Sequence, residues 1–228
     1  FLYLTNLFLT SYIVDRGRVV TKEQFSTLDS STRDFERYLV KHRKYSVHLV
    51  LDLTEEDYRA ETIPHLRGAD QDAVLARRLG QIYRNSPFRH AIVQGREAEG
   101  RRDDKVLYHG IPNADLIKPW LAVIERIEVP LEGIYSAPVL SGQLLQSLDV
   151  FFPHTLLVSL SSGYGLRQTY FQNKHIKFSR LTQLQTTGEV DFGAQVAEEC
   201  SRTWQYLDSL RFLSGDDQLE VCVLVPAQ

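Results

Sequence analysis

Hydrophobic and polar residues alternate over the first 25 positions of the chain. The apolar runs on either side of Asp15-Arg16-Gly17 are rich in residues that favour strands. A glycine-containing turn between two such runs is typical of a β-hairpin. The stretch 1–25 is therefore predicted to form three antiparallel strands.

A helix and a further strand are predicted next. Phe35, Tyr38 and Leu39 recur at the i, i+3, i+4 spacing of one helix face, behind the N-cap candidates at 30–32. The short apolar run at 47–53 predicts a strand that joins the first three.

The middle of the chain has the pattern of a separate unit, because both kinds of element recur there within a short span. The elements expected are a strand at 58–63, a helix at 70–83, strands at 91–93 and 106–108 around an exposed polar loop at 95–105, and a helix with Leu116, Trp120, Ile124 and Ile127 on one stripe.

The last third of the chain repeats the order of the first. The elements expected are a strand at 131–135, a helix opened by Pro138 that carries Leu140, Leu144, Leu145 and Leu148, strands at 155–160, 166–171 and 175–178, a helix with Val196, Cys200, Thr203, Leu207 and Leu210 on one face, and a strand at 219–225. Three strands, a helix and a strand thus occur twice, which predicts two similar α/β halves.

Composition narrows the class of protein. The chain is 43% hydrophobic and 24% charged, as in ordinary globular proteins, and its net charge of −3 gives no general attraction to nucleic acid or anionic lipid. Its two cysteines, Cys200 and Cys222, lie in apolar-periodic segments and form no CxxC pair. This argues against a disulfide framework or a zinc site and predicts a reducing, cytoplasmic setting.

The order of elements resembles the actin-like ATPase superfamily, and most of all the cytoplasmic actin-like proteins of type IV pilus assembly and type II secretion. The resemblance lies in 47–64 with the helix after it, in the return through 105–135, and in the three-strand pattern of 155–180, which ends Lys177-Phe178-Ser179-Arg180. It spans nearly the whole chain but contains no invariant motif.

This resemblance implies an α/β fold with two actin-like (ribonuclease-H-like) halves, mixed sheets and an inserted α/β subdomain. Residues 1–149 are then expected to form the first half, including an insert at about 54–130. Residues 150–228 are expected to form a second half that is truncated.

The superfamily holds ATP between two glycine-containing hairpin turns, with an Asp for Mg²⁺. The first turn falls at Leu4-Thr5-Asn6-Leu7, which contains neither Asp nor Gly. The second, within 159–165, keeps Gly163 and Gly165 but has Ser159 where a carboxylate is expected. The resemblance therefore implies a degenerate ATPase-like domain with no catalytic residue and no metal ligand.

The second turn still supplies the candidate cofactor-binding residues. These form a degenerate phosphate loop, with Arg167 or Lys174 nearby: Ser161, Ser162, Gly163 and Gly165. Two interpretations stay open, a phosphate cradle and a hairpin whose glycines serve only the turn, of which the second is favoured. No cofactor is expected, and ATP with Mg²⁺ is the alternative.

Other chemistry finds little support in the sequence. Ser161-Ser162-Gly163 lacks the GxSxG elbow, and the seven histidines show no HxH or HExxH spacing. Asp52, at a strand end, invites comparison with ribonuclease-H nucleases, which need several carboxylates around two metal ions. Since the opening strand offers no acid as a partner, Asp52 is predicted to cap its strand.

The resemblance implies a non-catalytic scaffold of a bacterial envelope machine. Such a protein binds protein subunits of a membrane-bound pilus or secretion complex at the cytosolic face of the inner membrane. It reaches the membrane only indirectly or through a region outside this chain, and binds no nucleic acid. Exposed sheet edges or the insert at 94–105 are the expected contact surfaces. A nucleotide-binding ATPase or kinase-like protein, and an unrelated peptide-binding module, remain alternatives.

Overall fold

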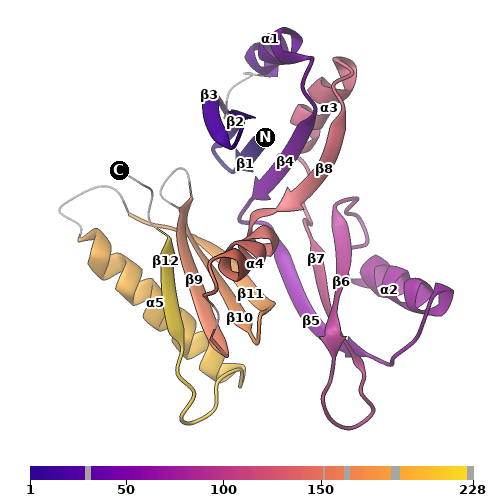
Figure 1. The fold of residues 1–228 in the computed structure, drawn as a ribbon, viewed down its shortest axis with the longest axis vertical. Helices are drawn as coiled ribbons and strands as arrows, with labels where there is room; N and C mark the ends of the chain where they lie inside the picture. Colours follow the sequence, from indigo (N-terminus) through magenta and orange to yellow (C-terminus); the bar gives the residue numbers. More distant parts are fainter. Residues whose placement is uncertain (29–31, 151, 162–164, 186–190, 225–228) are drawn as a thin grey trace.

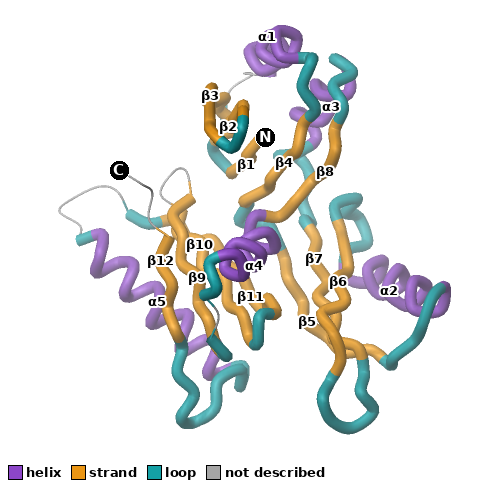
Figure 2. The backbone as a smooth tube through the Cα atoms, in the orientation of Figure 1, coloured by secondary structure: helices purple, strands orange, loops and turns teal. Residues whose placement is uncertain are grey.

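The computed structural model describes residues 1–28, 32–150, 152–161, 165–185 and 191–224. Its strands form three sheets, of five, four and three strands, each with at least one helix against it (Figure 1). Figure 2 shows the strands of the three sheets converging near one short helix at the middle of the molecule. This mixed α/β architecture is the one that the alternating patterns predict.

The elements follow the predicted order along the chain. They are β1 (Leu2–Thr5), β2 (Phe8–Asp15), β3 (Arg18–Ser26), α1 (Thr32–His42), β4 (Val47–Asp52), β5 (Asp57–Ile63), α2 (Ala69–Ile82), β6 (Arg89–Arg96), β7 (Asp104–Gly110), α3 (Lys118–Arg126), β8 (Leu131–Ser136), α4 (Ala137–Ser147), β9 (His154–Ser161), β10 (Gly165–Gln172), β11 (His175–Gln183), α5 (Phe192–Ser209) and β12 (Glu220–Leu224). No helix of the described residues is long and apolar enough to cross a membrane.

The five-stranded sheet has the order β3-β2-β1-β4-β8, and with α1, α3 and α4 it makes up the first half. β1 is antiparallel to β2 and parallel to β4. The predicted hairpin between β2 and β3 is confirmed, and both residues of its turn, Arg16 (φ 47°) and Gly17 (φ 77°), have positive φ. Two positive φ values match the twist of the flanking strands, which explains the glycine there.

Aromatic side chains hold two helices against one face of this sheet. The ring of Phe35 on α1 lies edge-on to Phe25, at 5.3 Å, and to Trp120 on α3, at 5.4 Å. Leu49 and Leu51 of β4 are buried in the same core. The helix α3 therefore packs within the first half, although it falls inside the predicted insert range of about 54–130. The predicted limits of the halves and insert stay a prediction.

The four-stranded sheet has the order β11-β10-β9-β12, and with α5 it makes up the second half. β9 is antiparallel to β10 and parallel to β12, as β1 is to β2 and β4, so the predicted internal repeat is confirmed. The buried residues of α5 are Glu199, Thr203 and Leu207. Leu210, predicted on that face, follows the last helical residue and is 45% exposed.

The three-stranded sheet has the order β5-β7-β6, and with α2 it makes up the insert. The two strands of the predicted long hairpin loop extend further than expected, to Arg96 and from Asp104. Asp104 is buried, and its partners offset the cost of removing the carboxylate from water. The carboxylate accepts a hydrogen bond from Gln71 Nε2, at 2.9 Å, and pairs with His65 Nδ1, at 2.9 Å. The exposed loop therefore covers only 97–103.

The helix α4 lies where the three units meet. It packs against β4 and β8 of the first half and against β11 of the second. Of the four leucines predicted for this helix, Leu145 is buried, whereas Leu144 and the C-cap residue Leu148 are 40% and 54% exposed. The helix thus presents apolar surface outside the core.

Gly110 gives a test of how closely the insert is packed. A Cβ atom at this position would lie 2.7 Å from ring carbons of Tyr83, whose hydroxyl donates to Asp57 Oδ2 at 3.0 Å and so fixes the ring. We expect Gly110→Ala to lower the free energy of unfolding by about 1–3 kcal/mol, measured by urea denaturation.

Gly80→Ala is the matched control. Gly80 lies inside α2, and no atom comes within 4 Å of a Cβ built there. Alanine is favoured over glycine in a helix by about 1 kcal/mol, so stability is expected to hold or rise. Equal effects of the two substitutions would contradict this account of the insert.

Candidate functional site

A buried ion pair joins the two halves of the molecule. Arg167 on β10 and Asp52 at the end of β4 are 4% and 2% exposed. Arg167 donates from Nε to Asp52 Oδ1 at 2.8 Å and from Nη2 to the Leu53 carbonyl oxygen at 2.8 Å. The Tyr3 hydroxyl donates to Asp52 Oδ2 at 2.5 Å. The prediction that Asp52 caps its strand is wrong, because its carboxylate is held by side chains from two other strands.

A second carboxylate, that of Glu56, lies beside this pair with no exposed side-chain surface. Arg167 Nη2 is 3.9 Å from Glu56 Oε1. Hydrogen bonds reach the carboxylate from the Leu53 backbone N–H (3.0 Å), the Tyr58 hydroxyl (2.5 Å), the Ser136 hydroxyl (2.6 Å) and His109 Nε2 (3.0 Å). This number of donors stabilises an ionised carboxylate that water does not reach.

The pKa values agree with this arrangement. Burial alone would raise the pKa of Glu56, but His109, Arg167 and Ser136 together hold the pKa below its ordinary 4.5. A lowered folded-state pKa contributes stability that is present above about 4.5 and is lost as the pH falls through the folded value. Burial, and then the charge of Glu56, raise the pKa of Tyr58 well above 10, which keeps its hydroxyl as a donor.

The first expected phosphate turn, at 4–7, uses its own side chains to satisfy its backbone. Thr5 Oγ1 accepts from the N–H groups of Leu7, at 3.4 Å, and Phe8, at 3.1 Å. Asn6 Nδ2 donates to Glu55 Oε2 at 2.9 Å. The N–H groups of Leu7 and Phe8, which a phosphate-binding turn would direct at its ligand, therefore already have an acceptor.

The second expected turn is described only in part. Ser161 and Gly165 lie opposite each other in the β9–β10 register and bring the ends of the turn together. Ser162 and Gly163 lie outside the described residues, so the phosphate-binding role of this turn stays a prediction.

The two basic residues expected beside this turn are placed differently. The guanidinium of Arg167 binds Asp52 and Leu53 of the first half. Lys174 follows the far end of β10, which is roughly 25 Å away at the rise of an extended strand. Neither residue is therefore available to the turn as the sequence suggested. Among the described residues, no group of three or more His, Cys, Asp or Glu side chains is placed to hold a metal ion.

A groove of about 600 Å³ opens between the first half and the insert. Its lining comes from β4, the segment before β6, β6, β7 and the residue after it, β8 and α4. It comprises Leu51, Pro87, Phe88, Arg89, His90, Ile92, His109, Ile111, Ile134, Tyr135, Ser136, Val139, Leu140 and Gln143. His109 and Ser136, which bind Glu56, form part of its wall, so the groove backs onto the buried polar cluster.

Sequence reasoning missed both the groove and the ion pair. The groove is assembled from short stretches up to 92 positions apart, none of which has a recognisable motif. The one available signal was the pair Ile134-Tyr135, two large apolar residues at the end of a predicted strand, which are each 37% exposed.

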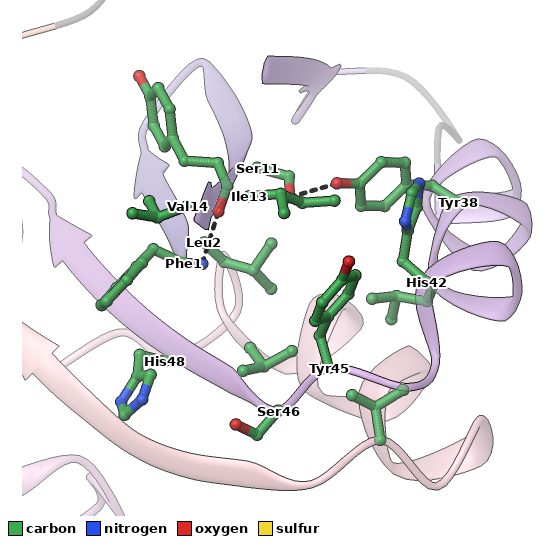
Figure 3. A pocket seen from close by; sticks show the side chains of 14 residues that line it. Phe1, Leu2, Ser11, Ile13, Val14, Tyr38, His42, Tyr45, Ser46 and His48 are labelled. Atoms are coloured by element: carbon green, nitrogen blue, oxygen red, sulfur yellow. Dashed lines mark hydrogen bonds between the residues drawn. The ribbon is translucent and has the colours of Figure 1, made fainter. Parts of the chain in front are cut away.

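Among the smaller hollows of the surface, two include residues of the first half in their lining. One, of about 330 Å³, adjoins the groove and shares Ile92, Val139 and Gln143 with it. The other, of about 230 Å³, lies at the end of β1 away from Asp52, and Figure 3 shows Tyr38, His42 and Tyr45 around it.

Two repeated halves around a buried junction, with an insert after β4, define the actin-like ATPase fold. No family model and no curated protein matches the sequence. Among solved structures, the chain is similar to the PilM–PilN type IV pilus biogenesis complex, with a TM-score of 0.64 and 9% identity over 97% of this chain and 80% of that one.

Two further structures align over nearly the whole chain. A protein of unknown function with an actin-like ATPase fold from Bacteroides thetaiotaomicron gives a TM-score of 0.54 at 12% identity, covering 99% of this chain and 81% of that one. The cytoplasmic domain of EpsL, an inner membrane component of the type II secretion system of Vibrio cholerae, gives 0.48 at 10% identity, covering 99% and 82%. The first match and the pilus complex confirm the predicted actin-like fold.

The buried pair predicts a large effect of removing Arg167. Arg167→Gln leaves Asp52 buried without a cation and removes one positive charge from beside Glu56, so the free energy of unfolding should fall by about 3–5 kcal/mol in urea denaturation. Arg37→Gln is the control, because Arg37 pairs with Asp34 on the surface of α1 at 81% side-chain exposure. It should cost less than about 1 kcal/mol. A similar small cost at both positions would show that the inter-half pair is not formed.

Proposed function

We propose that this chain is a non-catalytic docking module on the actin-like plan, which binds a segment of a partner protein in the groove between the first half and the insert. The observation that carries the proposal is the groove itself. Its apolar wall with a few polar groups at fixed positions has the character of a binding site. Ile134 and Tyr135 on its wall are large, apolar and exposed, which is typical of a surface that a partner covers.

The polar groups of the groove are held in place from behind. Ser136 and His109 are tied to Glu56, and the Tyr135 hydroxyl lies 3.3 Å from His48 Nδ1. Side chains whose rotamers are fixed before binding lose little entropy on binding, so such a wall favours one docking geometry.

The absence of catalysis is part of the proposal. Thr5 Oγ1 accepts hydrogen bonds from the N–H groups of Leu7 and Phe8. The guanidinium of Arg167 is paired with the carboxylates of Asp52 and Glu56. Both features support a domain that keeps the ATPase architecture and binds neither ATP nor Mg²⁺. The alternative, a nucleotide-binding protein with an unusual metal arrangement, rests on the second turn alone.

The proposed partner is a protein subunit of a bacterial envelope machine. The PilM–PilN structure is a complex of type IV pilus biogenesis, and the same fold in this chain supports a comparable role. We place that role at the cytosolic face of the inner membrane, where a pilus or secretion complex would present a segment to the groove.

A polar substitution in the groove tests the proposal. Ile134→Asn should reduce capture of an envelope-complex subunit by about tenfold or more in quantitative affinity purification from the native host, because one buried apolar anchor is lost. Leu148→Asn is the control: Leu148 is also exposed, on the loop end of α4, but does not line the groove. Equal capture by both variants, each with unchanged thermal stability, would contradict docking in the groove.

A further inference from the structure

The groove and the adjoining hollow form one continuous trough. They share Ile92, Val139 and Gln143, so the trough runs along α4 from β8 of the first half to the β10–β11 turn of the second. Near this far end, Gln94 Nε2 of the insert donates to the Ile176 carbonyl oxygen at 3.1 Å. All three units of the molecule therefore contribute to its lining.

The charged side chains that line the trough are all basic. The whole chain contains 29 Asp and Glu residues against 26 Lys and Arg, yet within the part of the chain that the structure describes no carboxylate lines either cavity. The basic and imidazole groups of the lining are Arg89, His90, His109, Lys174 and His175. The chain as a whole is slightly acidic, so the positive charge of the trough is a local property of its lining.

Further cations lie behind the far end of the trough. Burial, and then the charges of Lys177 and Lys105, lower the pKa of His175, and burial followed by Lys105 lowers the pKa of Lys177. The carboxylate among these groups is Glu97, which pairs with Lys105 at 3.0 Å. The lowered pKa makes the His175 imidazole neutral at physiological pH, so the positive charge in this region comes from the lysine ammonium groups.

The geometry points to a partner segment that is an extended, apolar peptide bearing at least one carboxylate. This inference rests on the proposed docking function and adds the chemistry of the partner. The apolar side chains fill the 600 Å³ groove beside Ile134 and Ile111. The carboxylate lies against Lys174 and His175, where it forms a charge-assisted contact with the ammonium group and accepts a hydrogen bond from the imidazole.

The test uses three pools of fluorescein-labelled decapeptides with the full chain. In each pool Leu, Ile and Phe alternate with one polar residue, which is Glu in the first pool, Gln in the second and Lys in the third. Fluorescence anisotropy measures binding at low and at physiological salt. We expect the Glu pool to bind about tenfold tighter than the Gln pool, the size of one charge-assisted contact, and the Lys pool to bind weakest. The preference should shrink as salt rises.

Two double variants test whether Lys174 and His175 cause the preference for the Glu pool. Lys174→Gln with His175→Gln should bring the Glu pool to the affinity of the Gln pool and leave the Gln pool unchanged. Lys41→Gln with His42→Gln is the matched control, an adjacent Lys–His pair on α1 that does not line the trough, and should change neither.

The outcomes separate this inference from the proposed function. Equal binding of the Glu and Gln pools, with both weakened by Ile134→Asn, overturns the charge preference and leaves groove docking standing. Binding that Ile134→Asn does not affect, or no binding of any pool, overturns the inference together with the docking function. Tighter binding of the Lys pool also overturns the inference.

Discussion

A single guanidinium inside the protein decides how the two halves of this molecule sit together. Arg167 of the second half reaches two buried carboxylates of the first, Asp52 and Glu56, and a backbone carbonyl beside them. Removing charges from water is costly, and the cost is offset only where each charge has close partners. The halves therefore keep the arrangement in which the cation meets both carboxylates, because a small displacement would lengthen these contacts while the three groups stayed out of water.

This constraint also shapes the surface. Glu56 is bound on one side by Arg167 and on the other by Ser136 and His109, which stand in the wall of the groove. The junction of the halves and the proposed docking site thus share one network of hydrogen bonds. The resemblance to actin-like ATPases implies a nucleotide held between two hairpin turns, one from each half. Here side chains of the protein occupy the junction, and the exposed apolar side chains of β8 lie beside it, in the wall of the groove between the first half and the insert.

Hydrophobic periodicity was enough to predict the order of strands and helices and the internal repeat. The buried face of each element is visible in the spacing of the apolar residues within that element alone. Periodicity failed where burial depends on a distant part of the chain. Asp52 and Arg167 are separated by 115 positions, and the isolated pattern of a strand ending in Asp gives no sign of a partner. Similarly, α3 followed the insert in sequence but packs through Trp120 on Phe35. The glycines at 163 and 165 suggest a phosphate loop from the sequence, whereas the residues that line the groove belong to no recognisable motif.

The buried ion pair of Arg167 and Asp52 joins the two halves, and we propose that it holds them together without a nucleotide. Pulsed electron–electron double resonance between two spin labels measures the separation of the halves directly. The labels are attached to cysteines that replace Lys41 on α1 and Glu198 on α5, both of which are exposed. Cys200 and Cys222 are first replaced by serine so that they are not labelled. The account predicts one narrow distance distribution that ATP and Mg²⁺ leave unchanged and that Arg167→Gln broadens. A broad distribution in the unsubstituted protein that narrows on addition of ATP and Mg²⁺ would contradict it.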